Sequence, residues 1–236
     1  MLVKIKKIIS CLLVISCLTP CVCVQAAPIK SQYTDGISYV LEKYGIVYNN
    51  DLSHEVLSYN TKLNVMNGIS NVYDSIGIYG LQDYFDPQDV TKLSGLKAED
   101  YAKIINGTGL EGYGYAFEGV EKKYKVNGLF VLGICIIESG WGNSSLARNK
   151  NNFTGMFAYD GNAYASGKTF NSLEDCVNYT ADRLQQNYLT QGGKFYSGGK
   201  SIFNVNVYYC TQASWAFKII NTIQDEIKEH LYMENV

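Results

Sequence analysis

The sequence predicts a mainly α-helical fold with one small lobe of different structure, and three stretches carry this prediction. The segment 172–189 (SLEDCVNYTADRLQQNYL) begins at Ser172, a residue type that caps helices, and Asp175 adds negative charge to the first turn. The segment 214–232 (SWAFKIINTIQDEIKEHLY) has the pattern of a closing helix. The polar and aromatic stretch 157–170 (FAYDGNAYASGKTF) indicates a hairpin or an irregular lobe.

The apolar run at 128–137 (GLFVLGICII) fits either a buried strand or a buried helix by composition. We predict a helix because its neighbours are helical, and because Gly140 and Gly142 are suitable helix stops. The segment 116–124 (AFEGVEKKY) places its apolar residues at helical spacing, and the residues after Ser94 suggest a short capped helix.

The composition limits the classes of function. Hydrophobic residues make up 47% of the 236 residues and charged residues 18%, which is enough for a folded core. A net charge of −2 gives no electrostatic footprint for nucleic acid. There are two histidines, and the spacing of Cys135, Cys176 and Cys210 matches no metal or disulfide framework. We therefore expect neither a metal nor another cofactor.

The first 27 residues have the pattern of a secretory signal peptide. A basic start (MLVKIKK) precedes an apolar run, and small residues before Ala27 form a cleavage site, so cleavage is expected after Ala26 or Ala27. Two alternatives are an uncleaved membrane anchor, because the apolar run is near the lower length of a span, and a lipid anchor on Cys17 in the lipobox-like VISC.

Residues 28–93 form a first section that we interpret as an N-terminal helical extension. Its short amphipathic patterns are separated by Asn, Asp and Gly, and no cluster of its residues indicates a chemistry. The role of this extension is open, and a second section begins at residue 94.

Glu138 is the first candidate for catalysis, because it directly follows the apolar run. A carboxyl at the end of a buried helix loses hydration, which raises its pKa. A carboxyl that holds its proton near neutral pH can act as a general acid. The alternative is that Glu138 has a structural role, as a solvent-facing residue at the helix end that forms a hydrogen bond with the next loop.

The surrounding residues favour the catalytic interpretation. The stretch NGLFVLGICIIESGWGNSSLARNKNNFTGMFAYD resembles the glucosaminidases of glycoside hydrolase family 73, which are endo-β-N-acetylglucosaminidases. The resemblance extends through KTFNSLEDCVNYTADRL and NVNVYYCTQASWAFKI, and covers roughly residues 94–228. It implies a lysozyme-like α+β fold, with a helical domain, a small β-lobe and a groove between them. It also implies that 94–236 is a catalytic domain that cleaves the β-1,4 bond after N-acetylglucosamine in peptidoglycan.

The resemblance assigns roles to particular residues. Glu138 falls on the family's general acid, and Tyr209 falls on a tyrosine that shapes the active site. Trp141, Asn151 and Asn152 fall on motif positions that are structural or form the groove, and we count Trp141 and Asn152 among the substrate-binding candidates.

The sequence also departs from the family. Residues 209–212 read Tyr-Cys-Thr-Gln where many members have Tyr-Ala-Thr-Asp, so an acid is lost. Asp160 is the candidate for a second carboxylate, which an inverting reaction needs. The other route uses the substrate's own 2-acetamido group with help from Tyr209, and we favour it. Tyr159 and Tyr164 are candidates for stacking on sugars.

Three other features had more than one interpretation. Trp215 heads the closing helix and is expected in the core, and the glycine-rich stretch 190–200 is either a lid or a connector. A thiol hydrolase built on Cys135 lacks a supported histidine partner.

The expected function is therefore that of a secreted, monomeric peptidoglycan hydrolase. Its partners are expected to be glycan strands, with no nucleic acid and, after signal cleavage, no membrane. The alternatives are a lytic transglycosylase on the same fold and a non-catalytic protein that binds or assembles the cell wall.

Overall fold

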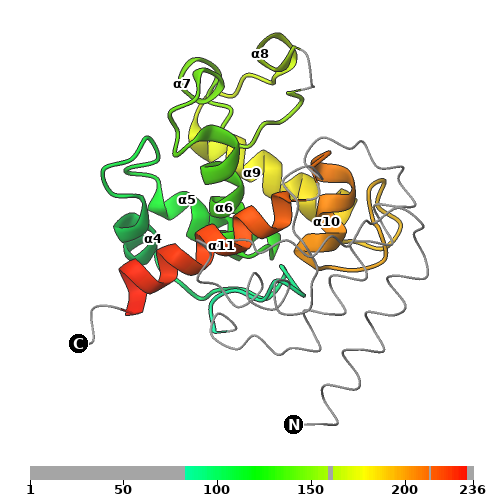
Figure 1. The fold of residues 1–236 in the computed structure, drawn as a ribbon, viewed down its shortest axis with the longest axis horizontal. Coiled ribbons are helices and arrows are strands. Elements are labelled where there is room, and N and C mark those ends of the chain that lie inside the picture. The colour runs from blue at the N-terminus through cyan, green and yellow to red at the C-terminus, as the bar shows by residue number, and fades with distance from the viewer. Residues whose placement is uncertain (1–82, 159–161, 213, 233–236) are drawn as a thin grey trace, which may run out of the picture.

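The structure is a computed structural model that describes residues 83–158, 162–212 and 214–232 (Figure 1). The predicted signal peptide and most of the N-terminal extension lie outside these residues. The elements in chain order are α4 (Ala98–Ile105), α5 (Gly114–Tyr124), α6 (Gly128–Ser139), α7 (Ser145–Lys150), α8 (Ala163–Ser166), α9 (Leu173–Arg183), the π-helical turn η2 (Leu184–Tyr188), α10 (Ile202–Tyr209), α11 (Trp215–Ile227) and the π-helical turn η3 (Lys228–Tyr232). In this part of the chain there is no strand, and no helix has the length and apolarity needed to cross a membrane. The predicted mainly α-helical fold is confirmed.

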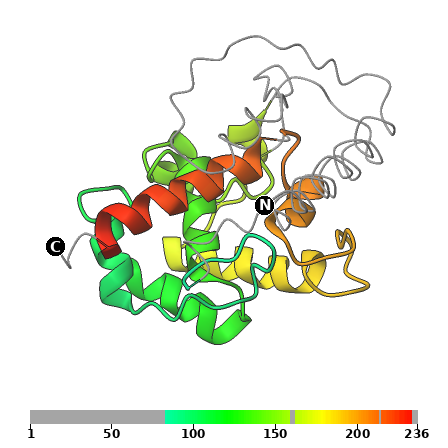
Figure 2. The ribbon, with the colours of Figure 1, turned by 60° about the horizontal axis from the view of Figure 1, so that its bottom comes forward.

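Helix α6 forms the centre of the domain, between α11 on one side and α9 on the other (Figures 1 and 2). It begins at Asn127, whose side chain accepts a hydrogen bond from the Phe130 N–H at 3.0 Å, and it confirms the predicted helix over 128–137. A Cβ atom on Gly133 would lie 2.7 Å from the Ile219 side chain of α11. A glycine within this helix therefore permits the close approach of α11.

The predicted N-terminus of the helix at 172–189 is also confirmed. The Ser172 hydroxyl accepts from the Asp175 N–H at 3.1 Å, and α9 then continues into η2. The helix expected after Ser94 begins at Ala98, and the side chain of Asp100 accepts from the Lys97 N–H at 2.9 Å. Ser94 itself takes part in a different contact.

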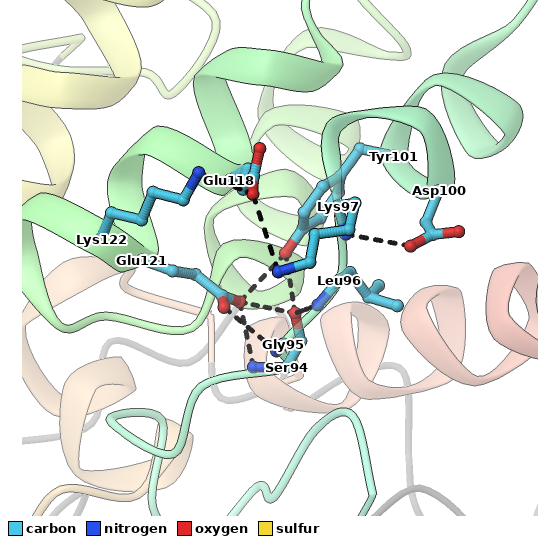
Figure 3. Close-up of polar contacts among 9 residues, drawn as sticks. All are labelled: Ser94, Gly95, Leu96, Lys97, Asp100, Tyr101, Glu118, Glu121 and Lys122. Carbon is cyan, nitrogen blue, oxygen red and sulfur yellow. Dashed lines mark hydrogen bonds and ion pairs between the residues drawn. The ribbon is translucent and has the colours of Figure 1, made fainter.

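The carboxylate of Glu121 on α5 binds Ser94 and Gly95 at the start of the domain (Figure 3), and it also binds the first residue of α6. The side chain is buried, with 4% exposure, and accepts from the Ser94 N–H and hydroxyl, the Gly95 N–H, the Tyr101 hydroxyl and the Gly128 N–H, at distances of 2.6–3.2 Å. A buried charge needs such a set of donors to replace its lost hydration. Glu121 therefore ties the loop before α4, α4 itself and the first residue of α6 to α5.

The expected β-structure of the small lobe is not found in its described residues. The lobe consists of α7, α8 and irregular chain, at one end of α6 (Figure 1). In this lobe, side chains donate hydrogen bonds to backbone carbonyls that would be bound by a neighbouring strand in a β-sheet. Lys150 Nζ donates to the Tyr164 and Gly167 carbonyls at 2.6 and 3.0 Å, and Asn151 Nδ2 donates to the Phe170 carbonyl at 3.1 Å. The alternative of an irregular lobe is the one that these residues show.

Helix α10 was not expected, because it follows the glycine-rich stretch. Ser201 caps it by accepting from the Asn204 N–H at 3.0 Å. The stretch 190–200 is anchored along its length, since the Phe195 N–H donates to the Asn187 carbonyl at 2.8 Å and the Phe195 ring lies 5.1 Å from that of Tyr188. These contacts favour a packed connector over a lid.

The segment 83–93 belongs to the packed domain, although we assigned it to the extension. Phe85 and Val90 are buried in the core, with 1% and 0% exposure. The Val90 N–H donates to the Lys200 carbonyl at 3.0 Å, and the Val90 carbonyl accepts from the Asn127 N–H at 2.8 Å. We therefore propose that the domain includes residues 83–93, upstream of the predicted boundary at 94.

This boundary predicts a difference between two truncated chains. A chain that starts at residue 78 should be more stable than one that starts at residue 94, because the shorter chain loses two buried side chains, each contributing about 1.5–3 kcal/mol. Urea unfolding followed by circular dichroism measures the difference. Equal unfolding midpoints for the two chains would return the boundary to residue 94.

Candidate active site

The end of α6 fixes the position of Glu138. The helix stops at Gly140, which has the left-handed conformation (φ 56°) expected of a helix stop. The Ser139 hydroxyl donates to the Cys135 carbonyl at 2.5 Å and accepts from the Gly142 N–H at 2.7 Å. Glu138 therefore projects from a helix end that is held by side-chain and backbone contacts.

The turn after α6 packs against the backbone of the loop between α4 and α5. The Gly109 N–H donates to the Trp141 carbonyl at 2.9 Å, and a Cβ atom on Gly142 would lie 2.7 Å from the Gly109 backbone. Trp141 itself has a left-handed backbone (φ 60°), and its partly buried ring packs against the core. The observed role of Trp141 is to form this turn, and contact with substrate stays a proposal for it.

The carboxyl of Glu138 lies between Trp215 and Gly155. Trp215 Nε1 donates to Oε1 of Glu138 at 2.7 Å. On the other side, a Cβ atom on Gly155 would lie 3.0 Å from Oε2, so a larger residue would press on the carboxyl. Gly155 also has a φ of +68°, a conformation that other residues rarely adopt. The indole of Trp215 and the backbone of Gly155 thus hold the carboxyl of Glu138 in place.

The pKa of Glu138 is raised above the ordinary value of a glutamate, as the sequence predicted. Burial is the main cause, because it disfavours the ionised form. The hydrogen bond from Trp215 and the positive charge of Lys218 oppose this increase, since both stabilise the carboxylate. The acid form of Glu138 therefore persists to a higher pH than that of an exposed glutamate.

Tyr209 lies beside this pair, at the end of α10. Its ring stacks on Trp215, with centroids 4.8 Å apart and an interplanar angle of 25°, and its hydroxyl donates to the Thr154 carbonyl at 3.0 Å. Burial raises the pKa of Tyr209 well above its ordinary value, and the charge of Glu138 adds to this effect. Tyr209 therefore stays neutral and connects α10 to the loop that carries Gly155.

Asn152 shapes the same loop. Its amide is buried, with 1% exposure, and donates to the Met156 and Lys168 carbonyls, both at 2.9 Å. Its oxygen accepts from the Met156 N–H at 3.0 Å. Because these groups are already bound to the backbone, we propose a loop-forming role for Asn152 in place of the substrate contact that we expected.

The other predicted site residues lie apart from Glu138 or outside the described chain. Tyr164 on α8 is exposed, and Lys150 Nζ lies 4.9 Å from its ring centroid. Tyr159 and Asp160 fall outside the described residues, so the predicted second carboxylate has no described position.

The structure disfavours thiol chemistry and gives no indication of a metal. Burial raises the pKa of Cys135 well above the ordinary value, which keeps the thiol protonated and a poor nucleophile. Among the described residues, no group of His, Cys, Asp and Glu side chains could hold a metal ion.

The sequence offered Trp215 as a core residue or a sugar-stacking ring, and it did not reveal the contact of Trp215 with Glu138. Trp215 is buried, as expected of a core residue, but its N–H binds a carboxyl that is 77 positions away in the chain. A tryptophan that begins an amphipathic helix looks like a packing residue, and only the contact between α6 and α11 gives its N–H a partner.

Comparison with known proteins connects this site to one family. Residues 114–228 match the model of the glucosaminidase family, described as mannosyl-glycoprotein endo-β-N-acetylglucosaminidase. Two Streptococcus pneumoniae proteins, one from a serotype 4 strain, are 32% identical to the chain over 158 residues, or 65% of its length. Both are named, provisionally, endo-β-N-acetylglucosaminidases. The matched region is 24% and 22% of their lengths, so the chain spans about a quarter of these relatives.

Solved structures of Staphylococcus aureus autolysin E share the fold. One matches with a TM-score of 0.52 and 21% identity, and covers 74% of this chain and 80% of that one. Two others have a TM-score of 0.50, with 23% and 22% identity, and cover 60% of this chain and 71% of theirs. They are a complex with the muropeptide NAM-L-Ala-D-iGlu and a catalytic mutant in complex with the disaccharide NAG-NAM. The fold class that the resemblance implied is confirmed.

The contacts of Glu138 predict how substitutions change its pKa. Trp215→Phe should raise the pKa further, because it removes a hydrogen bond to the ionised carboxylate and keeps most of the aromatic packing. Lys218→Gln should also raise the pKa by removing a positive charge, and Lys218→Arg should preserve it. Carbon NMR of the Glu138 carboxyl over a pH series measures each value. A lower pKa in Trp215→Phe would show that this hydrogen bond does not stabilise the carboxylate.

Proposed function

Residues 114–228 of the chain belong to the glucosaminidase family of glycoside hydrolases, and from this we propose that the protein is a secreted hydrolase of the bacterial cell wall. Its proposed reaction is cleavage of the β-1,4 bond after N-acetylglucosamine in peptidoglycan. The observation that carries the proposal is the carboxyl of Glu138, which is held by Trp215 at the end of a buried helix and has a raised pKa.

The complexes of the structural neighbour support the choice of substrate. Autolysin E structures contain the disaccharide NAG-NAM and a muropeptide, which are fragments of wall glycan. The family description and the pneumococcal relatives add an endo-β-N-acetylglucosaminidase activity. We propose the same class of glycan for this chain.

In the proposed mechanism, Glu138 donates its proton to the glycosidic oxygen as the bond to the leaving sugar breaks. Burial favours the protonated form of this carboxyl, and Trp215 binds one of its two oxygens, Oε1. As pH rises through the raised pKa of Glu138, the acid form is lost, and activity should fall with it.

The second part of the proposed mechanism is nucleophilic attack by the substrate's own 2-acetamido oxygen on the anomeric carbon. Water then opens the cyclic intermediate, and Glu138, now ionised, accepts a proton from that water. Tyr209 positions this half of the site, because it holds the loop of Thr154 and Gly155 against Trp215. The alternative is a single inverting step in which Asp160 activates the water.

Glu138→Gln should reduce hydrolysis of purified peptidoglycan by about 10²–10⁴-fold, because the amide keeps the shape but cannot donate an acid proton. Turbidity loss and new reducing ends measure the rate, and circular dichroism checks the fold. Glu118→Gln, the same change at a surface glutamate of α5, is the control. A folded Glu138→Gln protein with near wild-type turnover would remove Glu138 from the chemistry.

The stereochemistry of the product separates the two mechanisms. Substrate assistance involves two displacements and should give retained β-configuration, with only a mild loss in Asp160→Asn. An inverting base would give the α-anomer first, and a loss in Asp160→Asn as large as that in Glu138→Gln. Proton NMR of the first product identifies the anomer. Its mass shows whether water was added, and an anhydro sugar end would assign a lytic transglycosylase instead.

Export is the remaining part of the proposal, and it is based on the first 27 residues. Secreted material should begin at Ala27 or Pro28. N-terminal sequencing and intact mass measure this, and Cys17→Ser is the control because it blocks lipidation alone. A mature chain that retains Met1, or one with a lipid on Cys17, would contradict cleavage after Ala26 or Ala27.

A further inference from the structure

We propose that a cluster of two cations and three aromatic rings beside the candidate active site binds a carboxylate-bearing substituent of the glycan. This inference rests on the proposed function and adds a specificity site to it. We call the cluster the cationic platform, and it consists of Phe157, Lys168, Phe170, Tyr179 and Arg183.

The platform is built around the ring of Tyr179 on α9. Lys168 Nζ lies 5.1 Å and Arg183 Cζ lies 5.9 Å from the centroid of this ring, so two positive charges share one aromatic side chain. The rings of Phe157 and Phe170 lie 6.4 and 5.5 Å from Tyr179, in tilted arrangements. All of these separations are close to the contact range of aromatic pairs and of cations on aromatic faces.

The charges of the platform are not neutralised by the protein residues described. Within those residues, neither Lys168 nor Arg183 forms an ion pair, whereas Lys122, for example, pairs with Glu118 at 2.7 Å. The neighbouring Asp182 accepts from Gln186 at 2.8 Å. Each charge lies within 6 Å of the Tyr179 ring centroid, so an anion bound beside this ring would be stabilised. Arg183 offers the forked donors that suit a carboxylate.

Phe157 shows that the platform presents an aromatic ring to solvent. Its side chain is 38% exposed, and its backbone is in the left-handed region (φ 61°), which is strained for a residue with a bulky side chain. Such strained backbone positions occur preferentially at functional sites. An exposed ring that is held on a strained backbone, and that lies 5.9 Å from the Arg183 guanidinium, fits a surface on which a ligand lies.

The platform is connected to the candidate active site by one short loop. The Thr154 carbonyl binds the hydroxyl of Tyr209, Gly155 lies against the carboxyl of Glu138, and Phe157 is two residues further along. A second connection runs through Tyr188, whose ring lies 5.9 Å from that of Tyr209. Burial raises the pKa of Tyr188 to about 12, and the charge of Arg183 opposes this increase. Residues 154–157 therefore link the carboxyl of Glu138 to the platform, and the proposal places one glycan across both.

The occupant that matches this chemistry carries a carboxylate next to an apolar face. The peptide stem of wall glycan has this character, since the muropeptide of the autolysin E complex ends in an isoglutamate. Amidation of its free carboxylate removes the charge with little change of shape. The platform should therefore distinguish acid from amidated stems.

The test compares two soluble glycan fragments that differ only in this group, a free stem carboxylate or its amide. Wild-type protein should have a higher kcat/KM for the acid form. Arg183→Gln and Lys168→Gln should each reduce this preference by about three- to tenfold, mainly through KM, as expected for the loss of a partly exposed ion pair. Lys194→Gln is the matched control, because its Nζ lies 5.1 Å over the Phe195 ring, outside the platform.

Binding to Glu138→Gln protein, measured by calorimetry, provides a readout that does not depend on turnover. The proposal would be overturned if Arg183→Gln and Lys168→Gln both kept the preference for the acid fragment. It would also be overturned if Glu138→Gln protein bound the acid and the amide fragments with equal affinity. If the wild-type protein cleaves no wall glycan, the proposed function fails. A loss of acid preference in the binding experiment would still support an anion site.

Phe157→Asn separates a binding role from a structural one. Asn tolerates a left-handed backbone better than Phe, so the thermal midpoint should stay the same or rise, while the affinity for both fragments should fall because the ring is lost. A lower thermal midpoint with unchanged affinity would instead make Phe157 a packing residue and overturn its place in the platform.

Discussion

The burial of α6 is the constraint on which the site depends. From Leu129 to Ile136, no apolar side chain of the helix is more than 4% exposed, so its neighbours fix its position on all sides. Gly133 allows the close approach of Ile219 of α11, and Glu138, later in α6, meets Trp215, one turn earlier in α11. The contact between α6 and α11 thus produces both the partial burial of Glu138 and the hydrogen bond that orients its carboxyl.

Polar groups hold both ends of α6, and they help to fix the position of its contact with α11. At the N-terminus, the Asn127 side chain caps the helix and Glu121 binds the Gly128 N–H at 2.7 Å. At the C-terminus, Ser139 links the last turn to Gly142. These directional bonds add to the packing of the apolar faces, and together they determine how far Glu138 projects.

The sequence predicted features that depend on local pattern. These include the helix at 128–137, the cap at Ser172, the stop at Gly140 and the raised pKa of Glu138. It did not predict the Trp215 contact, because tertiary packing brings those residues together.

The structure also decides between alternatives that composition left open. The stretch 157–170 has the composition of a hairpin or an irregular lobe, and in its described residues Lys150 and Asn152 bind the Tyr164 and Lys168 carbonyls that a strand partner would bind. The packing of Phe85 and Val90 could not be predicted either, because their burial depends on residues far along the chain.

The site combines a nearly neutral centre with a charged margin, and the two have different physical requirements. The proposed role as a general acid requires Glu138 to keep its proton, and burial raises its pKa while Trp215 and Lys218 moderate the increase. A strong cation there would ionise the acid and remove its function. The positive charge needed to attract an anionic glycan is therefore best placed away from the carboxyl. The cationic platform provides such a place, on a chain whose net charge of −2 gives little general attraction for an anion. In the proposed arrangement, this separation lets the protein hold a protonated acid and bind a charged substrate at the same pH.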